Sequence, residues 1–220
     1  MKISSLRPFI ILLLLTLTFT EVYAQNEGLA LWNSISVEKK ITKKLSVSLS
    51  GQARIVENIS YAQTYIGEVG LSYKFLKNFE ISGNYRYTER RKNETKDFKS
   101  RHRFYADLSY ERKLGFLKFE NRLRYQSQFK DNDGETDFDT SYLRNKLEIS
   151  YPNKSKFTPY ISGDLFYEIG AKIDQLRPKA GVSYKFAKHH TVDVSVFSNV
   201  DLVGTESSGA IIGLGYKFKF

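Results

Sequence analysis

The chain has no cysteine and very few of the other residues that bind metals or redox groups. Its 220 residues include no Cys, one Met and three His. This composition excludes disulfide scaffolds, thiol catalysis, Cys-based zinc sites and lipid anchoring on an N-terminal cysteine. It also leaves little material for a His-rich metal site, so we expect no cofactor and no metal.

Long apolar runs are also scarce, since the mean hydropathy is −0.41. The one clear run covers residues 9–19, after a basic start and before small residues that a signal peptidase reads. This pattern predicts a secretory signal peptide over residues 1–24, cleaved between Ala24 and Gln25, with residues 25–220 as one domain. The run is well short of the roughly 20 residues that a spanning helix needs.

Aromatic residues are abundant, with 15 Tyr and 16 Phe, and apolar residues alternate with polar ones along most of the chain. Residues 45–50, for example, read Leu-Ser-Val-Ser-Leu-Ser. Strict alternation is typical of a half-buried β-strand. Ten segments alternate in this way, and an N-terminal segment at 31–37 is added to them as a further candidate strand. We therefore expect eleven strands, at 31–37, 45–55, 65–75, 79–88, 103–111, 117–126, 143–151, 161–168, 179–186, 192–196 and 210–220.

The connections between these strands are expected to alternate between short turns and longer polar loops. Short turns are predicted at 39–44, 76–78, 113–116, 152–157 and 187–190. Longer loops are predicted at 56–63, 90–101, 130–140, 169–175 and 200–208. This asymmetry indicates an up-and-down barrel of the outer-membrane type, with short periplasmic turns.

The alternation does not say which face points outward, because a soluble lipocalin-like barrel shows the same pattern. Three features favour a membrane barrel: aromatics near both strand ends, small residues on the polar face, and segments long enough to cross at a tilt. The chain also ends on Tyr216, Phe218 and Phe220, which we interpret as an outer-membrane insertion signal. The predicted fold is an all-β, antiparallel up-and-down transmembrane β-barrel of about 10–12 strands, and a soluble secreted barrel is the less favoured alternative.

The strand count presents a problem of parity. Bacterial single-chain barrels have even strand numbers with both termini in the periplasm, whereas eleven is odd. Two arrangements remain open at this point. In one, ten strands from Leu45 to Phe220 form the wall and the segment 31–37 lies in the lumen or below the membrane. In the other, all eleven segments form the wall and the N-terminus is threaded inside.

Three stretches resemble a known bacterial family: Leu31-Trp32, residues 37–45 (Val-Glu-Lys-Lys-Ile-Thr-Lys-Lys-Leu) and residues 213–218 (Gly-Leu-Gly-Tyr-Lys-Phe). The chain resembles the uncharacterised outer-membrane β-barrel family called domain of unknown function 2490. The resemblance implies a location and a fold, and no activity to transfer.

Candidates for chemistry are few. His102 starts a strand near the long loops and is the one plausible general base, although alternation points it outward with Phe104. Five carboxylates within 131–139 invite a Ca²⁺ interpretation, but the spacing lacks the EF-hand's closing Glu, and a solvated acidic loop is favoured. No nucleophile motif or phosphate-binding loop occurs, so we expect no enzyme. The alternative is a lipid A or phospholipid hydrolase.

The polar face carries charges of both signs that are expected to meet in the lumen. We predict a lumen charge cluster made of Arg86, Arg103, Arg122, Arg124, Arg144, Lys146, Glu120, Glu148, Asp164 and Glu168. One interpretation is an anion-preferring pore, since basic rings attract anions. The favoured one is an ion-pair network that fills a narrow barrel, because the two signs nearly balance.

We therefore expect a non-enzymatic outer-membrane barrel of a Gram-negative bacterium, either structural or a narrow pore. The alternative function is a lipid-modifying enzyme or a small-solute transporter. Expected partners are outer-membrane lipid, lipopolysaccharide and the barrel insertion machinery. The net charge of +10 does not indicate nucleic-acid binding, because it alternates along strands and forms no basic helix or patch.

Overall fold

The computed structural model describes residues 28–91, 98–132, 135–204 and 208–220. The predicted signal peptide and its cleavage site lie outside these residues. No helix long and apolar enough to span a bilayer occurs in the part of the chain that the structure describes.

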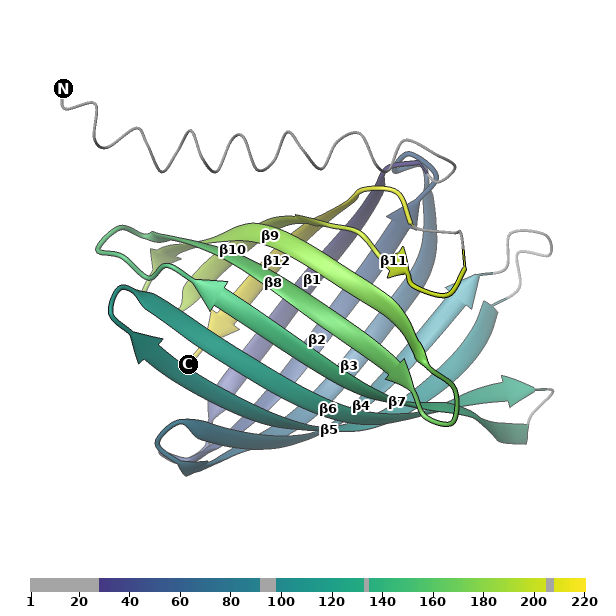
Figure 1. Ribbon diagram of the computed structural model, residues 1–220, viewed down its shortest axis with the longest axis horizontal. Helices are drawn as coiled ribbons and strands as arrows, with labels where there is room; N and C mark the ends of the chain where they lie inside the picture. Colours follow the sequence, from purple (N-terminus) through teal and green to yellow (C-terminus); the bar gives the residue numbers. More distant parts are fainter. Residues whose placement is uncertain (1–27, 92–97, 133–134, 205–207) are drawn as a thin grey trace.

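Eleven long strands form a closed barrel, and one additional strand of two residues pairs at its rim. Each long strand hydrogen-bonds to the next long strand along the chain, which gives the up-and-down order visible in Figure 1. The strands are β1 (Ala30–Lys40), β2 (Leu45–Val56), β3 (Tyr61–Leu76), β4 (Phe79–Arg91), β5 (Phe98–Leu114), β6 (Leu117–Asn132), β7 (Glu135–Ser150), β8 (Phe157–Glu168), β9 (Ile173–Ala187), β10 (His190–Phe197), β11 (Val200–Asp201) and β12 (Ile211–Lys219). The expected all-β barrel of 10–12 strands is confirmed.

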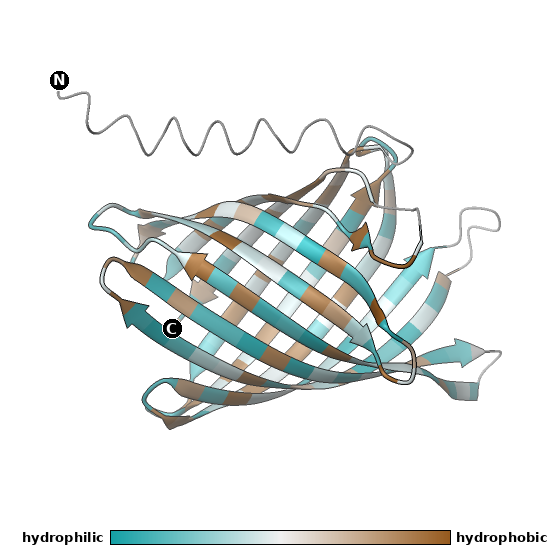
Figure 2. Cartoon of the chain, in the orientation of Figure 1, coloured by the Kyte–Doolittle hydropathy of each residue, from teal (hydrophilic) through white to brown (hydrophobic). Residues whose placement is uncertain are grey.

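The alternation of apolar and polar residues gives the barrel wall an apolar face and a polar face. Successive side chains of a strand point to opposite faces, so apolar residues at every second position share one face. In this barrel that face is the outside, where Leu49, Leu71, Leu108, Leu147 and Leu214 are exposed. Figure 2 shows the resulting exchange of hydrophobic and hydrophilic segments along the strands. The polar positions point inward and supply most of the buried side chains.

The barrel closes through a parallel strand pair. β1 and β12 run in the same direction, with Ala30 opposite Ile211 and Glu38 opposite Lys219. An up-and-down barrel with an odd number of strands must contain one such pair, because its first and last strands point the same way. The structure therefore selects the eleven-segment wall, and the arrangement with ten strands and residues 31–37 outside the wall is wrong.

The parallel seam can be tested with engineered cysteines, because the chain has none of its own. Ile35 on β1 lies opposite Tyr216 on β12 and opposite Gly51 on β2. Adjacent strands lie about 4.8 Å apart, within the Cα separation that a disulfide requires. We expect the Ile35→Cys/Tyr216→Cys variant to form an intramolecular disulfide on mild oxidation, read as a gel shift.

The matched control is the Gly51→Cys/Tyr216→Cys variant, which joins strands separated by β1. It should not crosslink. A bond in the control and none in the test variant would mean that β12 closes directly on β2 and that β1 lies outside the wall.

The connections differ from those expected at one end of the barrel. We call one end of the barrel the turn end; it holds Phe220 and the turns at 41–44, 77–78, 115–116, 151–156 and 188–189. The opposite end, which holds Gly28, is called the loop end. The predicted long loop at 130–140 is wrong, because β6 and β7 continue as a hairpin to Asn132 and from Glu135. This hairpin projects beyond its neighbours in Figure 1. The difference in loop length between the two ends is therefore smaller than the sequence suggested.

Aromatic side chains gather near both ends of the outer surface. At the turn end the ring of Phe79 lies 5.8 Å from Phe75 and 4.7 Å from Tyr110. At the loop end Phe104 lies 5.1 Å from Tyr85 and 6.1 Å from Phe129. Two such belts with aliphatic residues between them are the pattern of a barrel that crosses two lipid–water interfaces.

Candidate functional site

Three cavities formed by the described residues lie in series in the lumen. The loop-end cavity has a volume of about 440 Å³, the middle cavity about 390 Å³ and the turn-end cavity about 560 Å³. Trp32, Arg54 and Arg86 line both of the first two. Glu68, Tyr105, Arg122 and Arg124 line both of the last two. Two layers of side chains therefore divide the interior.

Arg124 and Asp107 form the best-defined ion pair of the lumen. They lie opposite each other on β6 and β5 and are both buried. Arg124 Nε donates to Asp107 Oδ1 at 2.6 Å, and Nη2 donates to Oδ2 at 2.7 Å. This two-bond arrangement satisfies both charges and fixes their geometry.

A second ionic group joins three strands. Arg144 of β7 donates from Nη2 to Asp164 Oδ2 of β8, and both residues are buried. Arg122 of β6 approaches the same carboxylate at 3.5 Å. Two cations therefore share one anion, and Arg144 Nε and Asp164 Oδ1 have no hydrogen-bond partner among the described residues. On the neighbouring strands Arg86 donates from Nε to Glu68 Oε2 at 2.6 Å.

Aromatic rings stack with these guanidinium groups inside the barrel. Arg124 lies 3.7 Å from the ring centre of Tyr105, and Arg144 lies 3.9 Å from that of Phe166. Arg54 lies 3.6 Å from the ring of Trp32. Cation–π contacts of this kind stabilise desolvated cations. These contacts cannot be identified from the sequence alone; the available signal is that Tyr105 and Phe166 occupy polar-face positions between charged residues.

The residues of the predicted lumen charge cluster lie in several places. Most of them line the middle cavity, namely Arg86, Arg122, Arg124, Arg144, Lys146 and Asp164. Arg103 lines the loop-end cavity and Glu120 the turn-end cavity. Glu148 accepts from Lys146 Nζ at 2.7 Å, and Glu168 accepts from Thr140 Oγ1 at 2.7 Å near the loop end. The structure thus brings six of the ten together.

His102 lies on the outer surface near the loop end. Its Nδ1 is 2.7 Å from Tyr85 Oη and its Nε2 is 3.2 Å from Asp131 Oδ2. The hydroxyl of Ser100 lies 3.0 Å from Tyr87 Oη. His102 is thus oriented by a carboxylate, as a general base requires, but its other nitrogen contacts a phenol.

The acidic stretch 131–139 is split between the two faces of the β6–β7 hairpin. Asp131 binds His102 outside, whereas Asp139 Oδ2 accepts from buried Gln128 Nε2 at 2.7 Å. Among the residues that the structure describes, no group of three or more His, Asp or Glu is arranged to hold a metal ion. Asp133, one of the five carboxylates of the calcium interpretation, lies outside the described residues.

The chain end that we interpret as an insertion signal lies at the turn end. Tyr216 Oη is 2.7 Å from His190 Nδ1, and the Phe218 and Phe220 ring centres are 5.1 Å apart. Glu38 on the parallel partner strand forms ion pairs with the neighbouring Lys217 and Lys219. These contacts hold the last strand to the first one.

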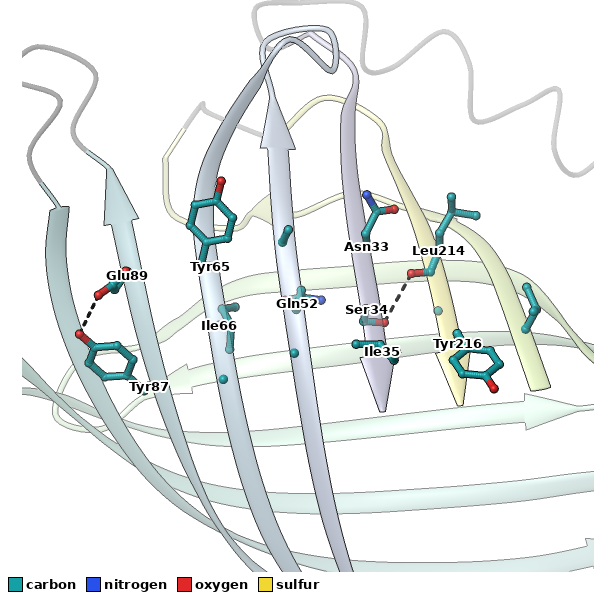
Figure 3. Close-up of a pocket in the computed structure, with 15 residues that line it drawn as sticks. Asn33, Ser34, Ile35, Gln52, Tyr65, Ile66, Tyr87, Glu89, Leu214 and Tyr216 are labelled. Atoms are coloured by element: carbon teal, nitrogen blue, oxygen red, sulfur yellow. Dashed lines mark hydrogen bonds between the residues drawn. The ribbon is translucent and has the colours of Figure 1, made fainter. Parts of the chain in front are cut away.

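A shallow hollow of about 750 Å³ marks the outer surface beside the parallel seam. Figure 3 shows Tyr65, Leu214 and Tyr216 around it. The hollow forms because Gly51 and Gly67 lie opposite each other on adjacent strands and carry no side chains. It opens onto the exposed apolar surface and supplies no cluster of charged groups.

The segment after β10 is fixed at the rim of the loop end. Asn199 accepts a hydrogen bond from Arg177 Nε at 2.6 Å. The backbone N–H groups of Val203 and Gly204 donate to Asp201 Oδ1. The hydrogen bond from Gly204, together with that from Val203, lowers the pKa of Asp201 because both stabilise its ionised form.

The fold and the interior define a closed all-β barrel with an apolar exterior and an ionic lumen. The chain belongs to the family described as protein of unknown function (DUF2490), whose sequence profile matches residues 29–204. No curated protein matches the chain at a significant level. The expected membership of this family is confirmed; Leu31-Trp32 and residues 37–45 lie within the matched region, whereas residues 213–218 lie beyond it.

Proposed function

We propose that this protein is a non-enzymatic outer-membrane barrel of a Gram-negative bacterium, with a lumen that its own side chains close. The exposed aliphatic band supports a membrane location. Monomeric soluble proteins rarely expose contiguous apolar surface larger than a few hundred Å². The two aromatic belts support it independently.

The observation that supports a closed lumen is the set of buried ion pairs around the middle cavity, which we call the middle layer. Arg124–Asp107 and Arg144–Asp164 project from adjacent strands into the barrel and stack on Tyr105 and Phe166. A water-filled channel would leave such groups hydrated and exposed. Their burial favours a structural role over transport of solutes.

Planar-bilayer recording tests this proposal. We expect the purified full-length mature protein to give no stable conductance steps. An Arg124→Ala/Asp107→Ala variant, which removes a complete ion pair and leaves no unpaired charge, should show small steps because the layer is thinned. Stable, anion-selective steps from the unmodified protein would instead establish the narrow-pore alternative.

A lipid-modifying enzyme is the second candidate, and the contact between His102 and Asp131 favours it. Their position at the loop-end aromatic belt would place them at the level of lipid headgroups. Hydrolysis of phospholipid or lipid A that is lost in His102→Ala and retained in the surface variant His189→Ala would establish this function. The primary proposal predicts no hydrolysis from any of the three proteins.

A further inference from the structure

The two ends of the lumen differ sharply in charge. Among its described residues, the turn-end cavity is lined by both signs in similar numbers: Glu38, Glu68, Glu80, Asp107, Glu111 and Glu120 with Lys74, Lys77, Lys118, Arg122, Arg124, Lys217 and Lys219. The loop-end cavity is lined by Arg54, Arg86, Arg90, Arg101 and Arg103, and by Glu57 as the one carboxylate among the described residues. Among the described residues, the lining of the loop-end cavity is therefore predominantly positive.

Most bases that line the turn-end cavity have carboxylate partners among the described residues. Lys118 Nζ lies 2.7 Å from Glu111 Oε2, and Lys217 Nζ lies 2.9 Å from Glu38 Oε2. These ion pairs neutralise the turn-end cavity locally. No extra counter-ion is needed there.

The arginines at the loop end are paired differently. Arg86 has a carboxylate partner in Glu68. No ion pair between two described residues involves Arg54 or Arg103. Arg54 donates from Nε to the neutral Gln52 side chain at 3.0 Å. Arg103 donates to neutral Gln128, and its buried Nε has no partner among the described residues.

Arg54 lines this cavity together with Arg86, Arg90 and Arg103, so like charges gather around it. Electrostatic repulsion from Arg86 and Arg103 therefore acts on Arg54. Such repulsion is strong in a partly desolvated interior, where screening by water is reduced. A bound anion would remove the repulsion, and guanidinium groups bind phosphate-type oxyanions through paired N–H donors.

We propose that the loop-end cavity is a binding site for a small phosphate-bearing molecule. Its volume of about 440 Å³ lies within the range of about 300–1,000 Å³ that small-molecule pockets occupy. Neutral hydrogen-bonding groups also line the cavity and suit a polar body attached to the phosphate: Gln63, Thr64, Thr88, Gln128, Asn199 and Ser208. The site concerns this cavity alone and does not depend on whether the middle layer conducts.

The one tryptophan of the chain provides a reporter. Trp32 lines the loop-end cavity and stacks on Arg54, so an anion that moves Arg54 changes the surroundings of the indole. We would titrate the full-length mature protein in lipid nanodiscs with inorganic phosphate, pyrophosphate and glucose 6-phosphate at constant ionic strength. Trp fluorescence and calorimetry would both be followed, with chloride as the reference anion.

The expected result is saturable binding of at least one phosphate compound and none of chloride. Arg103→Gln, which leaves Trp32 and Arg54 in place, should weaken binding at least about tenfold, as loss of a charged hydrogen bond does. Lys77→Gln removes the same charge at the turn-end cavity and should change Kd less than about twofold. A lower Kd for glucose 6-phosphate than for phosphate would identify a phosphorylated metabolite, and the reverse order would identify free phosphate.

Binding that is absent in both measurements would overturn the proposal. So would binding that Arg103→Gln and Lys77→Gln weaken equally, because it would then reflect the overall positive charge. Circular dichroism and heat-dependent gel mobility must show that each variant is folded. If Arg103→Gln does not fold, Arg101→Gln takes its place with the same expected and contrary outcomes.

Discussion

Asp164→Ala should lower the free energy of unfolding by about 3–5 kcal/mol. Asp164 is the shared carboxylate partner of Arg144 and Arg122. Its removal leaves two cations uncompensated in the interior, and breaking one side of a buried ion pair typically has this cost. Urea unfolding of the protein in lipid vesicles, followed by Trp32 fluorescence and gel mobility, measures the change.

Two matched variants give the result its meaning. Glu111→Ala breaks the Glu111–Lys118 contact, in which the glutamate side chain is 58% exposed, and should cost about 0–1 kcal/mol. Asp164→Ala/Arg144→Met removes both charges of the buried pair and should recover part of the loss. If Asp164→Ala costs no more than Glu111→Ala, water must screen the lumen and the closed interior is wrong.

Leu108→Arg should destabilise the membrane-inserted protein by about 2–4 kcal/mol, the cost of an arginine on the lipid face at mid-bilayer depth. Leu108 is 42% exposed on the outer face of β5, between Phe104 and Tyr110 of the two aromatic belts. Refolding into lipid vesicles at a series of urea concentrations measures the effect.

The control lies on the same strand and the same face. Leu114 is 50% exposed but lies beyond Tyr110, next to the turn at 115–116. Leu114→Arg should cost about 0–1 kcal/mol, because it lies near or outside the interface. Equal, small effects at both positions would indicate that the outer surface faces water and would support a soluble barrel.

Most of the barrel wall could be predicted from the sequence because the period of a strand is exactly two. The inward and outward positions of 45–55 or 143–151 follow from alternation alone. The loops were predicted less well. At 130–140 the polar residues suggested a loop, yet they pair across β6 and β7 as a hairpin. Polar composition does not distinguish a solvated strand from a loop.

The contacts inside the lumen could not be predicted, because alternation does not specify how strands are staggered. Arg124 binds Asp107 directly opposite it, whereas Arg144 lies opposite Phe166 and reaches diagonally to Asp164. The closure of the barrel was unpredictable for a related reason. Parity showed that eleven strands conflict with an all-antiparallel ring, but only the register of β1 on β12 shows the parallel seam.

The charge of the chain also gained a location. A net charge of +10 had suggested little about partners when the two signs nearly balanced along the strands. In the structure, the described residues that line the turn-end cavity carry both signs in similar numbers, whereas those that line the loop-end cavity are mostly arginine. The sequence gives the position of a charged residue along its strand, but the height of that residue in the barrel depends on how the strands are staggered.

The measurement that tests the account most directly is membrane fractionation followed by gel electrophoresis of boiled and unboiled samples. A barrel that crosses the outer membrane should be found in the outer-membrane fraction. It should also migrate faster when unboiled, because the closed β-sheet resists detergent until it is heated. Recovery in the soluble periplasmic or secreted fraction, with the same mobility before and after boiling, would contradict the account.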